Sequence, residues 1–173
     1  MDEGQSVDWQ LPDVTLAING TKDQVYLSQL ISNQRVLIIG CPGAFLPTCT
    51  EKHIPGYRDF MPLLRKAVDR VVCVAVNDPY VLKEWASELN CPPDFLLVAD
   101  WQGKLTSTLG LELDARAYHM GSRCRRFCLL VEHGVVVWFG LEEDAFVERL
   151  AVVLRHLDLI SASELNEIQT RFF

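Results

Sequence analysis

Three unbroken apolar runs, each as long as a β-strand, constrain the fold of this chain more than any other feature. They cover Val36 to Cys41, Val71 to Val76 and Phe95 to Ala99. Runs that are apolar at every position predict strands buried on both faces, which is typical of a parallel sheet covered by helices. Because helical patterns separate the runs, we predict an α/β fold with a parallel core.

The segments between the runs have the spacing and the end signals of helices. Apolar residues from Tyr57 to Leu64 recur at helical intervals, and Pro55 and Pro62 are expected to kink or divide this element. After the second run, Asp78 is the expected N-cap of a helix that begins at Pro79. We therefore expect a divided helix after the first strand and a continuous one after the second.

The second half of the chain changes the strand direction. Arg126 to Glu132 and Val135 to Phe139 are strand-like, and the two residues His133 and Gly134 between them predict an antiparallel hairpin. A helix is expected from about 142 to 156. We predict one domain over residues 1–173, with an additional helical tail over about 158–173 that begins at a capping box of Ser161 and Glu164.

Composition and charge exclude several functions. The net charge of −7 disfavours binding to nucleic acid. The apolar runs are much shorter than the roughly 18 residues that a membrane-spanning helix needs. The acidic start from Met1 to Glu3 does not resemble a signal peptide. We therefore expect a cytoplasmic protein without nucleic-acid or membrane partners, with the mitochondrion or another organelle as the alternative if a transit sequence has been removed.

The cysteines do not form a metal motif. There are 6 of them, and no two are separated by two residues, which argues against a zinc site and a thioredoxin-type dithiol. Cys124 and Cys128 are four residues apart, as are Cys49 and His53, but neither pair has a second half that would complete a site. We predict no metal and no cofactor, and we expect most of these thiols to be buried core residues.

Cys49 stands out because it follows a predicted strand and lies at the predicted start of a helix. The sequence from Thr48 to Glu51 has the form of a capping box, which predicts Thr48 at the N-cap and Cys49 in the first helical turn. Unpaired amides and the helix dipole favour an anion there, and an arginine nearby would lower the thiol pKa further. Cys49 is therefore a candidate nucleophile.

The residues around Cys49 resemble a known family. The stretch from Pro42 to Cys49, followed by Lys52 to Tyr57, resembles the active-site loop and helix of the peroxiredoxins, closest to the type II branch that includes the fifth mammalian peroxiredoxin. Two later stretches fit the same branch, Val76 to Val81 and Arg125 to Val131. The resemblance implies a thioredoxin-like fold, a central mixed sheet flanked by helices, and reduction of hydroperoxides by a cysteine.

The resemblance also implies roles for individual residues. Cys49 would be the peroxidatic cysteine, Pro42 would shield it, and Arg126 would steady the thiolate and polarise the peroxide. The pocket would include Gly43, Leu46, Thr48 and His53, although His53 could equally pack beside the kink at Pro55.

One position departs from the family motif. The motif reads Pro-x-x-x-Thr-x-x-Cys, and its threonine slot holds Leu46, which can neither donate nor accept a hydrogen bond. Losing one such preorganised bond typically costs about 10²- to 10³-fold in rate. The chain is thus expected to react slowly, to prefer bulkier apolar hydroperoxides, or to be inactive. In the last case it would act as a dimeric scaffold or a thiol sensor.

The cycle and the partners follow from the resemblance alone. Because no cysteine follows Cys128, a one-cysteine cycle is favoured, in which glutathione, glutaredoxin or thioredoxin attacks the oxidised Cys49. Cys73 stands where some relatives carry a second cysteine, so it is a candidate resolving cysteine, although a mid-strand core residue is the more common role. Cys124 is expected in a loop between Arg123 and Arg125, whose charges could make it reactive, although surface solvation of these arginines is the favoured interpretation. A homodimer is also implied.

Overall fold

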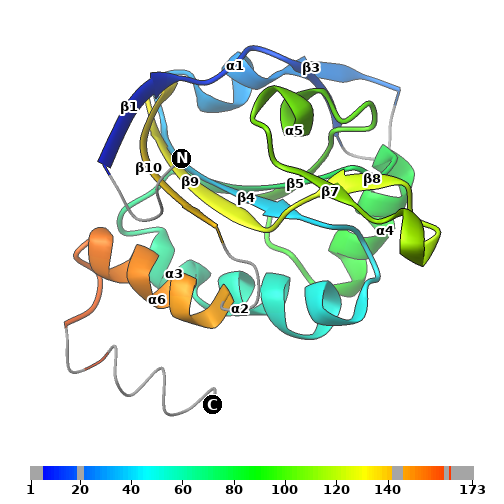
Figure 1. The fold of residues 1–173 in the computed structure, drawn as a ribbon. Coiled ribbons are helices and arrows are strands. Elements are labelled where there is room, and N and C mark those ends of the chain that lie inside the picture. The colour runs from blue at the N-terminus through cyan, green and yellow to red at the C-terminus, as the bar shows by residue number, and fades with distance from the viewer. Residues whose placement is uncertain (1–5, 19–21, 142–145, 162–163, 165–173) are drawn as a thin grey trace.

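The computed structural model describes residues 6–18, 22–141, 146–161 and 164. A central twisted sheet lies between two groups of helices (Figure 1). In chain order the elements are β1 (Ser6–Gln10), β2 (Thr15–Ile18), β3 (Gln24–Tyr26), α1 (Leu27–Ile31), β4 (Arg35–Cys41), the π-helix η1 (Cys49–His53), α2 (Ile54–Asp59), α3 (Met61–Leu64), β5 (Arg70–Ala75), α4 (Pro79–Glu88), β6 (Phe95–Ala99), α5 (Lys104–Thr108), β7 (Glu112–Asp114), the 3-10 helix η2 (Arg116–Tyr118), β8 (Ser122–Cys124), β9 (Phe127–Glu132), β10 (Val135–Leu141) and α6 (Phe146–His156).

The main sheet is mixed, as predicted. Its strand order is β1-β10-β9-β4-β5-β6-β2-β3, and β7 and β8 form a separate pair. The three apolar runs are β4, β5 and β6, which pair in parallel at the centre. Their interior positions are almost entirely buried. The thioredoxin-like fold class is therefore confirmed.

The late hairpin is also confirmed. β9 pairs with β10 on one side and with β4 on the other, antiparallel in both cases. The turn residues His133 and Gly134 have φ angles of 51° and 86°, which suit a two-residue turn of the type that follows the twist of the strands. Because β9 lies beside β4, its first residues are brought next to the end of β4, where the candidate site begins.

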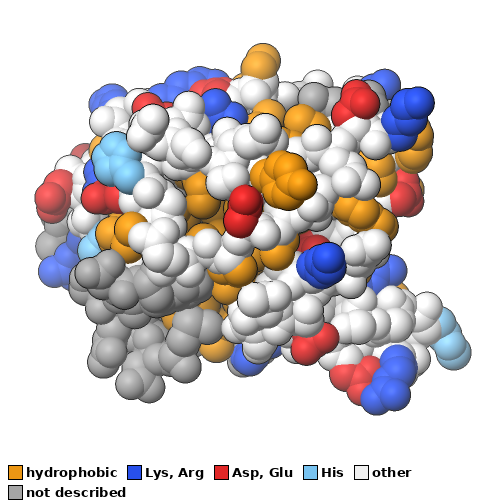
Figure 2. All heavy atoms as spheres, turned by 90° about the horizontal axis from the view of Figure 1, so that it is seen from above, with side chains coloured by type: hydrophobic (Ala, Val, Ile, Leu, Met, Phe, Trp, Pro, Cys, Tyr) orange, Lys and Arg blue, Asp and Glu red, His pale blue; other side chains and the backbone are white. Residues whose placement is uncertain are grey.

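Two hydrophobic cores flank the sheet. One packs the inner face of α2, α3, α4 and α6 against alternate residues of β4 and β5, and it includes Cys41, Cys49 and Cys73. The other packs α1 and α5 against the opposite face. On the outer surface above α1 and α5, acidic and basic side chains are interspersed (Figure 2). Among the helices that the structure describes, none combines the length and apolarity needed to cross a membrane.

The helix after β4 is divided, as its prolines predict. Pro55 lies in the first turn of α2 and Pro62 in the first turn of α3. The two helices meet at Phe60, which has φ −89° and ψ 2°. The π-helix precedes Pro55, and its closing bond runs from the Ile54 N–H to the Cys49 carbonyl, five residues back. The π-helical turn therefore begins at the candidate nucleophile, Cys49.

The expected capping box at Thr48 is wrong. Helical residues begin at Pro47, before the π-helix, and the Thr50 N–H donates to the Leu46 carbonyl at 2.9 Å. Thr48 itself has helical φ and ψ of −59° and −39° and makes no capping hydrogen bond. Leu46 thus holds the N-cap position, with Pro47 as the first helical residue.

Other predicted end signals are present. The Asp78 carboxylate accepts from the N–H groups of Tyr80 and Val81, each at 3.0 Å. In the tail, the Ser161 N–H donates to Glu164 Oε2 at 2.8 Å and the Glu164 N–H to Ser161 Oγ at 3.3 Å. The remainder of the predicted tail helix, residues 165–173, lies outside the described residues, as do residues 142–145 at the start of the predicted helix before it.

Candidate active site

The loop after β4 is held in place by residues distant in the sequence. The Ala44 N–H donates to Asn77 Oδ1 at 3.0 Å. A Cβ added at Gly43 would lie 3.0 Å from Arg123 Nη1 and 3.2 Å from Asn77 Oδ1, so the loop packs closely against these groups. Arg123 is itself fixed, because its Nη1 donates to the Val76 carbonyl at 3.0 Å.

The first turn of the helix is anchored to α4. Trp85 is fully buried, and its Nε1 donates to Thr50 Oγ1 at 3.1 Å. The Phe45 ring leans on Trp85 with the ring centroids 6.4 Å apart. Pro42 and Gly43 are buried, whereas Thr48 is exposed. The loop and the helix start therefore form one braced unit around Cys49.

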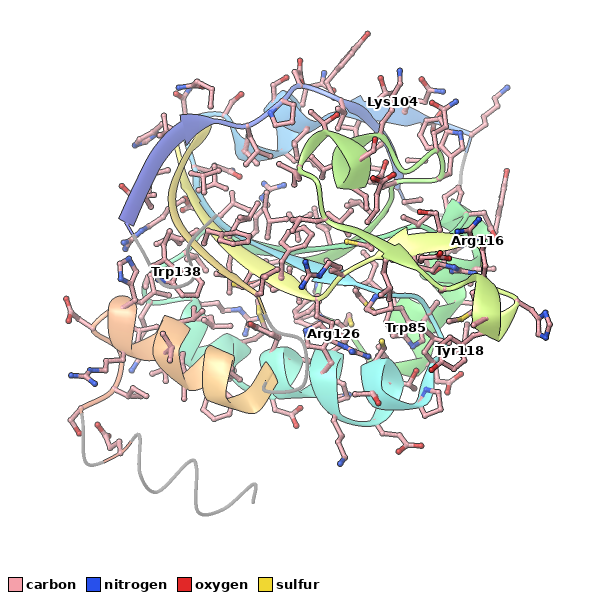
Figure 3. The ribbon with its side chains drawn as sticks, viewed as in Figure 1. Trp85, Lys104, Arg116, Tyr118, Arg126 and Trp138 are labelled. Carbon is pink, nitrogen blue, oxygen red and sulfur yellow. The ribbon has the colours of Figure 1, made fainter. Side chains whose placement is uncertain are left out.

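Arg126 reaches this unit from the sheet. It directly precedes β9, and its Nη2 donates to Cys49 Sγ at 3.4 Å. Figure 3 shows the Arg126 side chain between the sheet and the layer of helices that carries Cys49. A guanidinium at this distance favours a thiolate and can stabilise negative charge on an oxygen that leaves the sulfur. Cys49 and Arg126, 77 residues apart, are thus brought together.

His53 lies one turn beyond Cys49, and its two expected roles coexist. It is completely buried, and its ring meets Tyr57 edge to face at a centroid distance of 5.8 Å. A ring nitrogen of His53 and the sulfurs of Cys41 and Cys49 all lie within 4.8 Å of one another. His53 therefore packs in the core and also faces the thiol.

Cys41 is the unexpected member of the site. It ends β4, is completely buried, and shares a hydrogen bond with Cys49. It also hydrogen-bonds Cys73 from the neighbouring strand β5. The sequence placed Cys41 in the core and did not connect it with Cys49. A cysteine at the last position of a strand, facing the following helix, is the signal that could have revealed it.

The pKa of Cys49 is raised, contrary to the expectation from the sequence. The hydrogen bond with Cys41 is the largest cause and burial is the second, while His53 and the charge of Arg126 act in the opposite direction. Cys49 has no exposed surface, so the desolvation of a thiolate outweighs the favourable charge of Arg126. This arrangement therefore disfavours the Cys49 thiolate.

Leu46 contributes an apolar side chain where the family motif has a hydroxyl. It is half-buried and packs against the core that contains Cys49. Its Cδ1 lies 3.5 Å from the position that a Cβ on Gly43 would take, so the side chain leans over the loop. Its own backbone carbonyl is engaged by the Thr50 N–H. The side chain offers the helix start no capping group.

The two remaining candidate cysteines, Cys73 and Cys124, are both buried. Cys73 is buried in the middle of β5. Cys124 is not in a loop: it ends β8, is buried, and has its pKa raised to about 12, chiefly by burial. The raised pKa does not support activation of Cys124 by its neighbouring arginines, which was the less favoured of the two interpretations.

Cys41, Cys49 and His53 have the spacing to hold a thiophilic metal ion. Two thiolates and an imidazole would supply three ligands of a tetrahedral site. However, the Arg126 guanidinium lies 3.4 Å from one of the sulfurs. A fixed cation at this distance repels a metal ion, so the arrangement suits a thiol nucleophile better.

Comparison with known proteins agrees with this geometry. The model of the family described as Redoxin matches residues 6–153. The chain is 37% identical over 145 residues to chloroplastic peroxiredoxin-2E of Arabidopsis thaliana, covering 80% of this chain and 62% of that protein. It is 39% identical over 126 residues to peroxiredoxin-2B of the same plant, covering 70% and 78%. The alignment with peroxiredoxin-2E thus spans less than two thirds of that relative.

A solved structure gives the same result. Reduced Prx3 of Vibrio vulnificus, crystallised in complex with hydrogen peroxide, superposes with a TM-score of 0.77 at 31% identity, covering 91% of this chain and 99% of that one. The chain therefore belongs to the redoxin family and, within it, to the type II peroxiredoxins, a class of thiol-dependent peroxidases.

Proposed function

We propose that this chain reduces hydroperoxides through Cys49. One observation carries the proposal: Arg126 Nη2 lies 3.4 Å from Cys49 Sγ at a helix start enclosed by a buried proline loop. The Cys49 sulfur, as thiolate, attacks one peroxide oxygen, and the O–O bond breaks. Cys49 becomes a sulfenic acid, and the other oxygen leaves with a proton as water or an alcohol. Arg126 stabilises the charge on the departing oxygen.

Leu46 points to the substrate class. Its apolar side chain packs against the core that contains Cys49. It gives a peroxide oxygen no hydrogen bond, but it can contact the hydrocarbon part of an organic hydroperoxide. We therefore propose slow reduction of hydrogen peroxide and relatively faster reduction of apolar organic hydroperoxides.

A second function is favoured by the environment of Cys49. Its complete burial and its hydrogen bond with Cys41 raise its pKa, and both effects suppress the thiolate that a peroxidase needs. A protein with this geometry could serve as a slow thiol sensor or as a scaffold. The relevant quantity is the rate of Cys49 oxidation compared with that of a free cysteine.

The experiment is stopped-flow oxidation of the reduced protein by hydrogen peroxide and by cumene hydroperoxide, beside Cys49→Ser. Peroxidase function predicts a rate constant well above that of free cysteine, lost in Cys49→Ser, with cumene hydroperoxide favoured. If both peroxides react no faster than with free cysteine, the sensor or scaffold function replaces the proposal.

The reducing partner is proposed to be a thiol: glutathione, glutaredoxin or thioredoxin. The one-cysteine cycle that the sequence favours requires this thiol to attack the Cys49 sulfur directly. Because Cys49 has no exposed surface, such an attack would require the loop or the helix start to open. Steady-state turnover with each of the three reductants, at a fixed peroxide concentration, identifies the partner.

A homodimer through the surface around the active-site loop is a further proposal from the family resemblance. Exposed aromatic side chains lie in the loop, in the first turn of α4 and in η2, namely Phe45, Tyr80 and Tyr118. Exposed aromatics of this kind are common at protein interfaces. Sedimentation of the wild type and of Tyr80→Ser tests this, because loss of an interface aromatic should shift the equilibrium toward monomer.

The cytoplasm remains the proposed location. Relatives include proteins described as chloroplastic and mitochondrial, so organelles are the alternative. Fluorescent tagging of the C-terminus in cells of the source would decide between them.

A further inference from the structure

The thiol next to Cys49 lies within the same protein core. Cys41 and Cys49 are both completely buried, and their sulfurs lie within 4.8 Å of each other. A disulfide requires an S–S distance of about 2.05 Å. Closing the remaining gap takes less than about 3 Å, a movement on the scale of side-chain rotation together with a small shift of the connecting loop.

The backbone around Cys41 limits which groups can move. Cys41 is paired through β4 with Ala75 of β5, so its main chain is fixed by the sheet. Cys49 lies at the start of the π-helix, where the wide turn at Ile54 replaces the regular helical bond. Cys49 lies outside the sheet, so the two sulfurs can approach through a shift of the loop or the helix start that breaks no strand pairing.

Cys41 is better placed than Cys73 to react with Cys49. Cys41 hydrogen-bonds both of the other thiols, whereas Cys73 hydrogen-bonds Cys41 and has no hydrogen bond with Cys49 among the causes of its raised pKa. Among the described residues, the group of thiol and imidazole ligand atoms within 4.8 Å of one another contains Cys41 and not Cys73.

We propose that Cys41 is the resolving cysteine, which attacks the sulfenic acid of Cys49 to give an intramolecular disulfide. This rests on the peroxidase function proposed for Cys49. The Cys41 sulfur bonds to the Cys49 sulfur, the S–O bond of the sulfenic acid breaks, and the hydroxyl leaves with the Cys41 proton as water. An external dithiol then reduces the disulfide, restoring both thiols and becoming oxidised itself.

His53 is the group that can carry the proton in this step. Its ring nitrogen lies within 4.8 Å of both sulfurs, so it can accept the Cys41 proton as the sulfur attacks and donate one to the departing hydroxyl. This matters because the pKa of Cys41 is raised well above its usual range, chiefly by burial. A nearby acceptor removes the need for a free buried thiolate.

Burial makes the internal thiol the first available partner. A protein reductant cannot contact Cys49 while it is covered, but Cys41 already does. The outcome differs from the one-cysteine cycle, because the species presented to the reductant is a disulfide rather than a sulfenic acid. A dithiol reductant is then preferred over a single glutathione.

The sequence offers a sharp test by mass spectrometry. Tryptic cleavage after Arg35 and Lys52 releases peptide 36–52, which contains Cys41 and Cys49 and no other cysteine, while Cys73 falls in peptide 71–83. Reduced protein is treated with one equivalent of hydroperoxide in the presence of dimedone, quenched with acid and N-ethylmaleimide, and digested. Further cleavage after Phe45 separates the two cysteines unless a disulfide joins them.

The expected product is peptide 36–52 lacking two hydrogens and unlabelled, whose halves stay joined after cleavage at Phe45. Cys41→Ser should instead give a dimedone adduct on Cys49. Cys73→Ser, a matched buried thiol on the next strand, should keep the joined product.

Two results would overturn the inference. A dimedone adduct on Cys49 with Cys41 alkylated in the wild type shows that Cys41 does not resolve. A cross-link between peptides 36–52 and 71–83, or between two copies of the chain, assigns resolution to another thiol. If Cys49 is recovered fully alkylated after excess hydroperoxide, the peroxidase function itself has failed, and that result is distinguishable from the other two.

Discussion

Replacing Leu46 by threonine tests what the departure from the motif costs. Leu46 occupies the N-cap of the helix that carries Cys49, because its carbonyl accepts the Thr50 N–H at 2.9 Å. An N-cap hydroxyl accepts a hydrogen bond from the N–H two or three residues on, and the third residue here is Cys49. The same hydroxyl could donate to a peroxide at the Cys49 sulfur.

Two magnitudes follow from this geometry. A gained N-cap hydrogen bond stabilises the fold by about 1 kcal/mol. A preorganised hydrogen bond to the peroxide in the transition state raises the rate of Cys49 oxidation by about 10²- to 10³-fold. The first magnitude is a gain in the free energy of unfolding and the second is kinetic, so the two can be measured separately.

Leu46→Val is the matched control. Valine has the shape of threonine without the hydroxyl, so both variants lose the same leucine packing against the core. Denaturant unfolding gives the stability difference between the two variants, and stopped-flow oxidation by hydrogen peroxide gives the rate difference.

The reasoning fails if Leu46→Val accelerates oxidation as much as Leu46→Thr. The gain would then come from removing bulk over Cys49 and not from a hydrogen bond. Equal stability of the two variants would likewise contradict the assignment of position 46 as the N-cap.

Three further perturbations test the site and its support. Arg126→Gln should slow Cys49 oxidation by about 10²- to 10³-fold, whereas Arg125→Gln, on the neighbouring residue, should change it little; equal losses in stopped flow would contradict the role of Arg126. Gly40→Ala should destabilise the fold by about 1–3 kcal/mol in urea unfolding, because a Cβ there would lie 2.2 Å from Phe127 Cε1, and an unchanged midpoint would argue against that contact. The rate of Cys49 labelling by iodoacetamide should still increase as the pH rises through the usual thiol pKa of about 8.5, because the pKa of Cys49 is raised, and a rate that levels off near neutral pH would refute the shift. Above that pH the folded state keeps a proton that the unfolded chain releases, so the contribution of Cys49 to the free energy of unfolding falls as the pH rises.

The fold was predictable because its signals are local. The apolar runs of β4, β5 and β6 have no polar position that would expose a face, so burial on both sides was the only inexpensive arrangement. The two-residue turn at His133 and Gly134 left β9 and β10 no option but antiparallel pairing. Pro55 and Pro62 each remove a backbone donor, which divides the helix after β4 wherever it packs.

The helix start was predicted in the wrong register. The pattern from Thr48 to Glu51 satisfies a capping box, but Pro47 satisfies the rule that proline prefers the first helical position. The structure follows Pro47, which makes Leu46 the N-cap and leaves Thr48 exposed. Greater weight on the proline would have given the correct register and would have shown that the motif position is also the capping position.

The environment of Cys49 could not be predicted from the sequence, because residues distant along the chain form it. Arg126 could be placed by resemblance, but the bracing by Asn77 and Arg123 depends on how β5 and β8 meet the loop. The raised pKa of Cys49 depends on Cys41, whose side chain could have pointed to either face of β4. A helix start and a nearby arginine predict a lowered pKa only when the thiol keeps contact with water.

Leu46 and Cys41 act on successive steps of the proposed cycle, and their effects reinforce each other. In the proposed cycle, Leu46 would slow the attack of Cys49 on a peroxide. It would also slow a second attack that oxidises the sulfenic acid further, because both reactions take place at the same sulfur. The attack by Cys41 needs no second peroxide and only a small shift of the connecting loop. The sulfenic acid of Cys49 would therefore form the disulfide before a second peroxide reacts with it. A chain with these two residues would reduce peroxides more slowly, but its Cys49 would be protected from irreversible oxidation.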